Sequence, residues 1–229
     1  PCVILINGGE VKIDSIQMYG NKNGQGMNII SSDVSVTNSM FYNMPDAIEY
    51  INVKNGLIAN NYIKNSPDDG VDLNGCEDVT IKNNVIIYAK DKGISVGASS
   101  ERISSGIFLL NNYVFNNGTA LSVKDNSKVD SKGNYYAYND IGMHAYRKNT
   151  WYNRSGGNIS SMNDFFKQNQ NNEYVDEYSN IDMKFIKKYS PIYKDRSTFF
   201  IPHELSYELK DQALVLHNNA SFEIPLEAF

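Results

Sequence analysis

The sequence has no excess of basic residues and no long apolar run. Its 229 residues include 21 basic and 26 acidic side chains, which gives a formal net charge of −5. Proteins that bind nucleic acid by neutralising phosphates need a basic surface, so this balance argues against that class. A membrane-spanning helix needs roughly 18 or more consecutive apolar residues, and the chain has no such run. We therefore expect no nucleic-acid partner and no membrane span.

Cysteine and tryptophan are scarce, with two copies and one copy. Cys2 and Cys76 can pair, but without a Cys-x-x-Cys spacing they say little about the redox compartment. The chain opens on Pro1, with no initiator methionine and no basic-then-apolar leader. We therefore expect a mature or excised piece from which any export signal is missing.

Glycine is absent from the last third of the chain, because all 16 glycines lie between Gly8 and Gly157. The chain also holds 31 asparagines, most of them before Asn180, and 16 tyrosines. Asparagine and glycine are poor helix formers and favour turns, whereas tyrosine favours strands. The composition therefore predicts an all-β structure whose character changes near residue 157.

A short phrase recurs through the chain, as in Gly70-Val71-Asp72-Leu73 and Gly93-Ile94-Ser95-Val96. Six copies begin at Gly24, Ala47, Gly70, Gly93, Ala120 and Gly142, at steps of 23, 23, 23, 27 and 22 residues. A second alternating motif, as in Val79-Thr80-Ile81, precedes most copies. Short strands at such a period cannot bury their apolar faces alone and must stack. The sequence predicts a parallel β-solenoid of seven or eight coils over residues 1–186.

A polar column follows the second motif: Ser39, Asn61, Asn84, Asn112 and Asn134. In stacked coils these residues fall above one another, about 4.8 Å apart. We predict that they form an internal ladder in which side-chain amides hydrogen-bond along the stack.

The apolar residues of each phrase point inward, so the residue between them lies on the outer face. That outer column reads Gly26, Glu49, Asp72, Ser95, Ser122 and His144. A second outer column, two residues on, reads Asn28, Ile51, Asn74, Gly97, Lys124 and Tyr146. Side chains on this face are not needed for the core and are free to carry function.

Carboxylates gather at one end of the outer face: Glu49, Asp68, Asp69, Asp72 and Asp91. Stacked carboxylates repel unless a cation or a shared proton intervenes, so they indicate either a Ca²⁺ site or a general acid with a raised pKa. Asp69 before Gly70 is equally explained as a turn former. Asp72 lies mid-strand, where Asp is depleted, and favours function. The metal set that we predict is Glu49, Asp68 and Asp72.

The repeat and its asparagine column resemble the right-handed parallel β-helix of the pectin-lyase-like superfamily over about residues 5–150. The phrases DDGVDL, KDKGISVG, LSVKD and HAYRK are also similar to β-helix domains of bacterial surface proteins. The first resemblance implies a carbohydrate substrate, but the superfamily contains lyases, hydrolases, epimerases and non-catalytic stalks. Both imply a secreted or cell-surface location.

Polygalacturonase-type glycosidases of that superfamily carry two acidic turns, a Gly-His-Gly turn and an Arg-x-Lys strand. Here Asp68-Asp69-Gly70 matches the first turn, but Lys92 replaces an acid in the second. No Gly-His-Gly occurs, and Arg147 and Lys148 are adjacent. These departures argue against hydrolysis by that mechanism and leave elimination or epimerisation open.

Basic side chains share the outer face with the acids: Lys92, Lys124, Arg147 and Lys148. They suit an anionic polysaccharide, and lyases of the superfamily often use Lys or Arg as the base. The alternative is a surface ladder of ion pairs, Asp69 with Lys92 and Asp125 with Arg147, each worth at most about 1 kcal/mol. His144 is either a proton carrier or incidental.

Aromatic residues cluster after the last clear copies: Tyr135, Tyr136, Tyr138, Tyr146, Trp151 and Tyr152. They suit stacking on sugar rings, although Tyr136 stands at a position expected to point into the core. Residues 187–229 contain no glycine and no clear repeat, and we predict a cap or the start of a further module. Two strands are expected there, Ala213-Leu214-Val215-Leu216 and Phe222-Glu223-Ile224.

The main hypothesis is a carbohydrate-active β-helix that acts on an acidic, uronate-containing polysaccharide by lyase-like or epimerase-like chemistry. The alternative is a non-catalytic β-helix that binds glycan or serves as a structural module of a surface protein. In the first case the candidate catalytic residues are Asp72, Asp91, Lys92, Lys124, His144 and Arg147. Candidate substrate contacts are Asp69, Tyr146, Lys148 and Trp151. Ca²⁺ is the expected cofactor of the acidic end.

Overall fold

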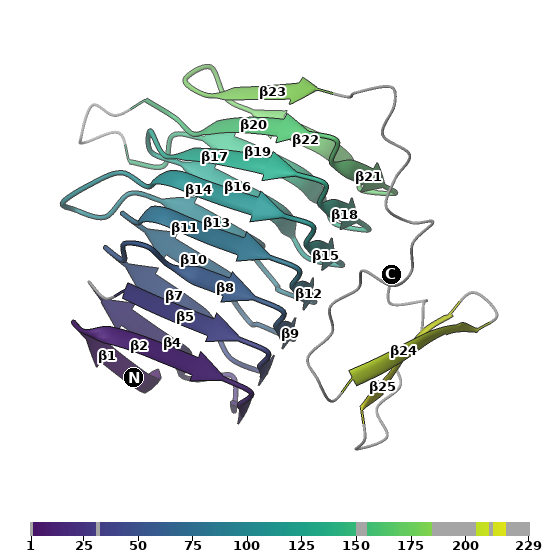
Figure 1. Ribbon diagram of the computed structural model, residues 1–229. Helices are drawn as coiled ribbons and strands as arrows, with labels where there is room; N and C mark the ends of the chain where they lie inside the picture. Colours follow the sequence, from purple (N-terminus) through teal and green to yellow (C-terminus); the bar gives the residue numbers. More distant parts are fainter. Residues whose placement is uncertain (1, 31–32, 150–154, 185–204, 211–212, 219–229) are drawn as a thin grey trace.

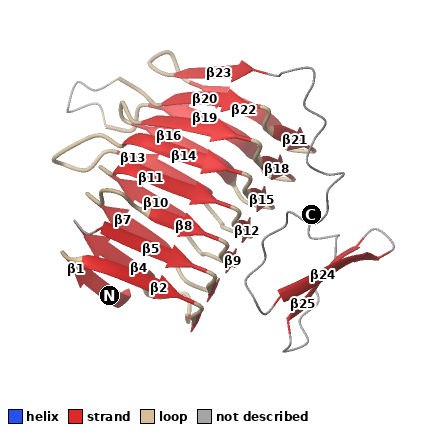
Figure 2. Cartoon of the chain, in the orientation of Figure 1, coloured by secondary structure: helices blue, strands red, loops and turns tan. Residues whose placement is uncertain are grey.

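The computed structural model describes residues 2–30, 33–149, 155–184, 205–210 and 213–218. Every regular element in these ranges is a β-strand, and none is a helix (Figure 2). No helix there could cross a membrane. Most of the strands stack in successive coils from the N-terminal end, and corresponding strands of each coil lie side by side (Figure 1).

The coils build three parallel sheets of eight, eight and seven strands. The first sheet consists of β1 (Cys2–Asn7), β4 (Gln25–Ile30), β7 (Ile48–Ile51), β10 (Val71–Asn74), β13 (Lys92–Gly97), β16 (Thr119–Lys124), β19 (Ile141–Tyr146) and β22 (Asn171–Val175). The second consists of β2 (Glu10–Asp14), β5 (Asp33–Thr37), β8 (Leu57–Ala59), β11 (Glu77–Lys82), β14 (Ser105–Leu110), β17 (Lys128–Lys132), β20 (Asn158–Met162) and β23 (Asn180–Lys184). The third consists of β3 (Gln17–Tyr19), β6 (Met40–Tyr42), β9 (Tyr62–Lys64), β12 (Val85–Ile87), β15 (Tyr113–Phe115), β18 (Tyr135–Ala137) and β21 (Phe165–Lys167). The predicted all-β solenoid of seven or eight coils is confirmed.

The core lies inside the three sheets. It is formed by rows of apolar side chains that occupy the same position in successive coils. Val71 pairs with Ile48 on one side and with Ile94 on the other, and all three are fully buried. Tyr136 is also fully buried, as predicted, and its hydroxyl pairs with that of Ser131 at 2.9 Å. Each coil therefore buries its apolar residues only because neighbouring coils cover them.

The corner between the second and third sheets explains the repeated asparagine pairs. The first residue of each pair adopts a left-handed conformation, with φ of 58° at Asn60, 55° at Asn83 and 53° at Asn111. Asn tolerates this conformation better than other non-glycine residues. The second residue turns its side chain inward and forms the ladder.

The predicted asparagine ladder is confirmed. Its five members are buried, and each backbone N–H donates to the side-chain oxygen of the next Asn, from Ser39 to Asn61 at 3.0 Å and onward. The ladder ends on Asp164, whose Oδ1 accepts the backbone N–H of Asn134 at 2.7 Å. Burial raises the pKa of this carboxyl, although its hydrogen bonds oppose the shift.

A second ladder, not predicted, lies at the corner between the third and first sheets. Asn117 donates its backbone N–H to Oδ1 of Asn139 at 2.9 Å, and Asn139 donates to Oδ1 of Asn169 at 2.9 Å. The backbone N–H of Ala89 donates to Asn117 at 2.7 Å. One and two coils earlier, this position is held by Ala89 and Ser66. The sequence therefore has asparagine at this position in the later coils only.

The predicted register of the first copy was wrong by two residues. Met27 pairs with Ile48, so the phrase there begins at Gly26 and not at Gly24. Asn28 therefore stands beside Glu49 in the outer column, in place of Gly26, and Ile30 stands beside Ile51, in place of Asn28. A shift of two residues keeps the same side chains facing inward, so the apolar pattern cannot detect it.

Beyond residue 186 the structure describes two antiparallel strands, β24 (Leu205–Lys210) and β25 (Ala213–Asn218). The strand expected over residues 213–216 is confirmed, whereas the one expected over residues 222–224 lies outside the described residues. The role of residues 187–229 as a cap or module stays a prediction. Cys2 and Cys76 are both free thiols, and Cys76 is buried in the core.

Candidate functional site

The outer face of the first sheet brings the predicted acids and bases together. Its central column reads Asn28, Glu49, Asp72, Ser95, Ser122, His144 and Tyr174. We call the residues at its acidic end the acid–base cluster: Asp46, Glu49, Asp68, Asp69, Asp72, Asp91, Lys92, Ser95 and Lys124. Most of these side chains are well shielded from solvent, so charges there interact more strongly than on an open surface.

Lys124 links two coils of the cluster. Its Nζ lies 2.9 Å from Oγ of Ser95, one coil away, and 4.0 Å from Oδ1 of Asp72, two coils away. The lysine stem crosses Gly97, where an added Cβ would lie 2.5 Å from Cε of Lys124. Glycine at this position therefore opens the path by which the ammonium reaches Asp72. The lysine and aspartate side chains are only 8% and 14% exposed.

Lys92 is held by two carboxylates. Its Nζ lies 3.4 Å from Oδ1 of Asp69 and also contacts Asp91. Burial works to lower the pKa of Lys92, but Asp69 and Asp91 outweigh it and raise that pKa above its usual value. The predicted ion pair between Asp69 and Lys92 is confirmed. Lys92 stays charged at neutral pH and offers positive charge more readily than it accepts a proton.

Glu49 and Asp69 are carboxyls of the cluster whose pKa values are strongly raised. Burial, followed by the charge of Asp72, raises the pKa of each to about 7. Hydrogen bonds from Asn28 and Gln25 partly oppose the shift at Glu49. Lys92 and Lys124 oppose it at Asp69. A carboxyl that titrates near neutrality can both give and take a proton.

Three carboxylates of the cluster converge closely enough to share a cation. One oxygen from each of Asp46, Asp68 and Asp69 lies within 4.8 Å of the others. Of the three predicted metal ligands, only Asp68 belongs to this trio. The other two, Glu49 and Asp72, lie side by side on the neighbouring strands β7 and β10. Within the described residues this trio is the one group of three or more potential ligands. Three oxygens suit a hard cation such as Ca²⁺.

The other end of the column carries His144, on which the charges of Lys92 and Asp91 still act. His144 stacks on Tyr146, with ring centroids 4.3 Å apart, and burial lowers the pKa of its imidazole. The guanidinium of Arg147 lies 3.4 Å from the ring centre of Tyr178. The expected pair of Arg147 with Asp125 was wrong, because Asp125 accepts the backbone N–H of Lys148 at 2.9 Å instead. Trp151 lies outside the described residues.

Sequence reasoning missed two members of the site, Asp46 and Ser95. Asp46 was given no role, although it belongs to the carboxylate trio and accepts Nε2 of Gln25 at 3.0 Å. Ser95 stands in the predicted outer column but was given no role, although it binds Lys124. Gly97 is the signal that could have revealed the role of Ser95. Because Gly97 has no side chain, it leaves room for the Lys124 side chain to cross toward Ser95.

The loop after Gly97, which makes the long step in the repeat, flanks one edge of this face. Ser99 donates its hydroxyl to Oδ1 of Asn52 at 2.7 Å, and Asn52 donates Nδ2 to Glu101 at 3.1 Å. An added Cβ at Gly75 would lie 2.3 Å from Oγ of Ser99. The loop therefore reaches back over two earlier coils and fixes the corner beside Asn74.

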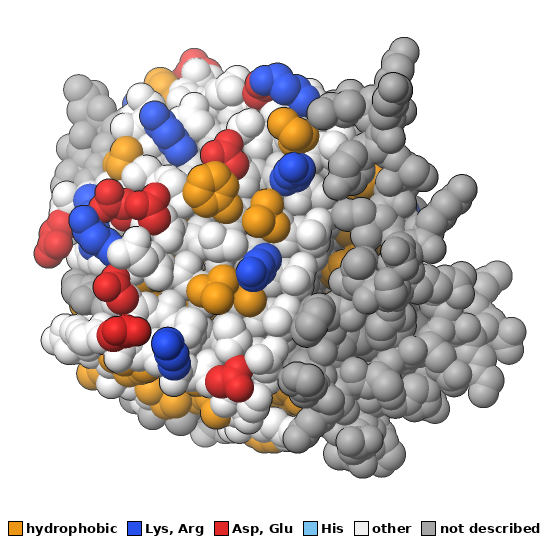
Figure 3. All heavy atoms as spheres, in the orientation of Figure 1, with side chains coloured by type: hydrophobic (Ala, Val, Ile, Leu, Met, Phe, Trp, Pro, Cys, Tyr) orange, Lys and Arg blue, Asp and Glu red, His pale blue; other side chains and the backbone are white. Residues whose placement is uncertain are grey.

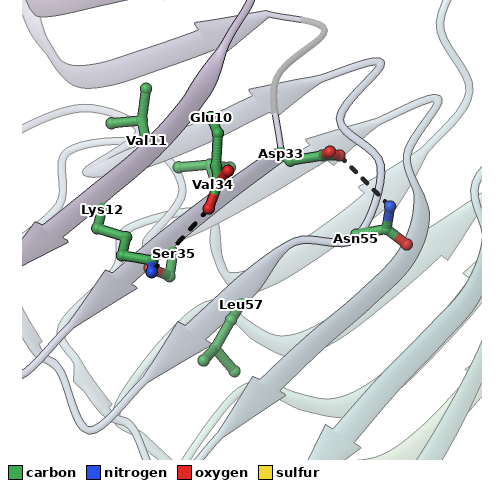
Figure 4. Close-up of a pocket in the computed structure, with 8 residues that line it drawn as sticks. All are labelled: Glu10, Val11, Lys12, Asp33, Val34, Ser35, Asn55 and Leu57. Carbon is green, nitrogen blue, oxygen red and sulfur yellow. Dashed lines mark hydrogen bonds and ion pairs between the residues drawn. The ribbon is translucent and has the colours of Figure 1, made fainter.

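The second sheet offers a hollow of its own, away from the cluster. Figure 3 shows acidic, basic and hydrophobic side chains interspersed on the face of the molecule seen in Figure 1. The hollow measures about 220 Å³ and is lined from β2, β5 and the start of β8 (Figure 4). Its charged groups are Glu10, Lys12 and Asp33. Lys12 and Glu10 are 80% and 77% exposed and form one loose pair at 4.0 Å. These solvated groups are poor candidates for catalysis.

The fold and the comparisons agree on the class of protein. Three parallel sheets around one core define a parallel β-helix. Residues 1–140 match the family described as "Right handed beta helix region", and the chain belongs to that family. No curated protein matches.

Among solved structures, the chain is similar to one named "Crystal structure of Agl-KA catalytic domain", with a TM-score of 0.59 and 11% identity. The match covers 80% of this chain and 45% of that one, so this chain spans less than half of the solved chain. At this identity the likeness shows the fold alone.

Proposed function

We propose that the protein is a carbohydrate-active β-helix that acts on an acidic polysaccharide at the acid–base cluster, by lyase-like or epimerase-like chemistry. The observation that carries the proposal is the reach of Lys124 across two coils to Asp72, beside carboxyls with pKa values near 7. The similarity in fold to a catalytic domain is consistent with it. We place the activity outside the cell or on its surface, where polysaccharides occur.

Elimination removes the proton next to the uronate carboxylate, breaks the bond to the leaving oxygen and forms a carbon–carbon double bond. It needs a base, an acid and a positive charge on the carboxylate. Glu49, when ionised, takes the proton and then gives it to the leaving oxygen, and its pKa of about 7 suits both transfers. This role moves from the lysines to Glu49 because the raised pKa of Lys92 keeps that lysine charged. Lys124 and Lys92 supply the positive charge. Asp72 holds Lys124 in position.

The charge of the cluster sets a condition on this reaction. It contains six carboxyls, Asp46, Glu49, Asp68, Asp69, Asp72 and Asp91, against two lysines. A uronate chain is repelled by that excess unless a cation bridges it to the protein. The trio of Asp46, Asp68 and Asp69 is where we place a Ca²⁺ ion that would do so.

A screen of uronate polysaccharides, read at the absorbance of the unsaturated product, tests the proposal with and without Ca²⁺. Neutral glucans serve as controls. Cleavage or epimerisation of an acidic glycan that depends on Asp72 supports the assignment. If no acidic glycan is cleaved or epimerised under either condition, the protein does not act on this class.

A non-catalytic glycan-binding or structural module is the second candidate. The observation that favours it is that Lys92 and Lys124 are both satisfied inside the protein, by Asp69 and Asp91 and by Ser95 and Asp72. A closed network of this kind stiffens the stack without any reaction. It predicts glycan binding without turnover, or no binding at this face.

A further inference from the structure

Two tyrosines interrupt a column of asparagines at the corner between the third and first sheets. From β6 to β21, the residue that follows each strand of the third sheet is left-handed, and it is Asn at 43, 65 and 116 and Gln at 168. In two coils the residue is instead Tyr88, with φ of 60°, and Tyr138, with φ of 57°. A bulky side chain rarely adopts this conformation, whereas Asn does so at little cost. Tyrosine at these two positions therefore points to a role other than turn formation.

The two tyrosines flank a slot. Asn116 occupies the coil between them, because β12, β15 and β18 pair in direct succession. Tyr88 and Tyr138 are thus two coils apart, about 10 Å along the stack. A hollow of about 390 Å³ lies here, lined by Tyr88, Ala89, Lys90, Asn116, Asn117, Gly118, Tyr138 and Asp140. A ring that stacks about 4.5 to 5 Å from each tyrosine fits this spacing.

The outer sides of the slot carry lysines from the coils beyond it. Nζ of Lys64 lies 5.9 Å from the ring centre of Tyr88, and Nζ of Lys167 lies 5.7 Å from that of Tyr138. Lys90 lines the hollow itself. Asp140 also lines it but already accepts Nε2 of Gln170 at 2.6 Å. In contrast to the acid–base cluster, this corner carries more positive than negative charge.

The floor of the slot is rigid and contains a buried, unused donor. The second ladder, through Asn117 and Asn139, fixes the backbone beneath it. Nδ2 of Asn116 is buried and has no hydrogen-bond partner in the described part of the chain, which costs free energy. A turn of the Asn116 side chain would bring this donor to a ligand oxygen in the slot.

We infer that this slot binds one residue of an acidic glycan, with the sugar ring between Tyr88 and Tyr138, a hydroxyl on Asn116 and the carboxylate near Lys90. The alternating apolar faces and hydroxyls of a pyranose match two aromatic walls and an amide floor. The inference shares the acidic glycan with the proposed function but does not require its reaction.

Titration calorimetry with a galacturonic acid hexamer tests the slot, in the Asp72→Asn background so that turnover is prevented. Replacing both tyrosines, Tyr88→Asn with Tyr138→Asn, should weaken binding and raise the Kd roughly three- to tenfold. The unfolding temperature should stay equal or rise, because Asn fits the left-handed position better. A purely structural role predicts the opposite pair of results. Tyr19→Ala, at an exposed tyrosine of β3, is the matched control and should leave the Kd unchanged.

Binding that survives the double substitution overturns the slot, as does a lack of any binding by the hexamer. Equal binding of a neutral glucose hexamer overturns its acidic specificity. The two proposals fail separately. Cleavage with unaltered binding in the tyrosine variants removes only the slot, and tyrosine-dependent binding without cleavage removes only the reaction.

Discussion

Asn84 donates both its backbone N–H and its side-chain amide to one atom, Oδ1 of Asn112, at 3.0 and 2.9 Å. Its amide also donates to the carbonyl of Ile58, at 3.0 Å, and all of these groups are buried. Each amide of the ladder thus satisfies backbone groups of neighbouring coils that no strand pairing reaches. The ladder fixes the sharp corner that the three sheets need.

Asn84→Leu should destabilise the protein by about 1 to 3 kcal/mol, because buried partners on both sides lose their hydrogen bonds. Urea unfolding followed by circular dichroism measures the change. Asn180→Leu, at an exposed position of β23, is the control and should have little effect. A midpoint for Asn84→Leu equal to that of the parent would mean that the ladder does not stabilise the fold.

The stability of the protein should fall as pH rises from about 4.5 to about 7. Glu49 has a pKa near 7 when folded and its ordinary value of 4.5 when unfolded, chiefly because it is buried. In that window the folded state holds a proton that the unfolded chain has lost, so rising pH favours unfolding. Glu49→Gln removes this proton and should flatten the fall in unfolding temperature.

Glu10→Gln, whose parent side chain is 77% exposed, is the control for that pH series and should keep the slope of the parent. The same slope in Glu49→Gln and in the parent would show that Glu49 titrates normally in the folded protein. Comparing the two variants cancels the contribution of all other groups to the change of unfolding temperature with pH.

Lys124→Ala and Asp72→Asn should each remove most activity on an acidic glycan, roughly a hundredfold or more, while the fold is kept. Both side chains lie in the acid–base cluster and contact each other at 4.0 Å. His144→Ala should have a smaller effect, since His144 stands three coils from Asp72, about 14 Å along the stack. Rates are compared with those of Lys12→Ala, at an exposed lysine of the second sheet. A rate for Lys124→Ala close to that of this control would remove Lys124 from the site.

Millimolar Ca²⁺ should raise the unfolding temperature, because a bound cation relieves the repulsion among Asp46, Asp68 and Asp69. Asp68→Asn should abolish most of the shift, whereas Asp130→Asn, at an exposed position of β17, should not. Thermal unfolding with Ca²⁺ and with chelator measures both. An unchanged temperature in the parent protein would rule out the cation site.

The fold could be predicted from the sequence because a solenoid repeats one local rule in every coil. The inward rows, the asparagine ladder and the pairing of Glu49 with Asp72 all follow from alternation and a period near 23 residues. The first copy was misplaced because glycine stands at both Gly24 and Gly26, and alternation is unchanged by a shift of two. The second ladder was missed because the two coils before Asn117 have Ala89 and Ser66 at this position, so the asparagine column is short.

The candidate site was less predictable, because it depends on where long side chains end. Sequence placed Lys124 in an outer column, but the direction of its stem over Gly97 toward Asp72 is a property of packing. Burial likewise decides that Glu49 and Asp69 have pKa values near 7, which alternation alone does not reveal. Tyr88 and Tyr138 stand out only because their backbone is left-handed. The pattern of apolar residues in the sequence does not reveal that conformation.

The strands of each coil pair only with those of the coil on either side, and this has a mechanical consequence. Force applied along the chain loads the outermost coil first, and its three short strands must open one after another while the rest of the stack stays intact. One coil of 23 residues extends to roughly 80 Å when it is pulled straight. Under tension the protein should therefore unfold one coil at a time, in steps of that length, and not in a single event.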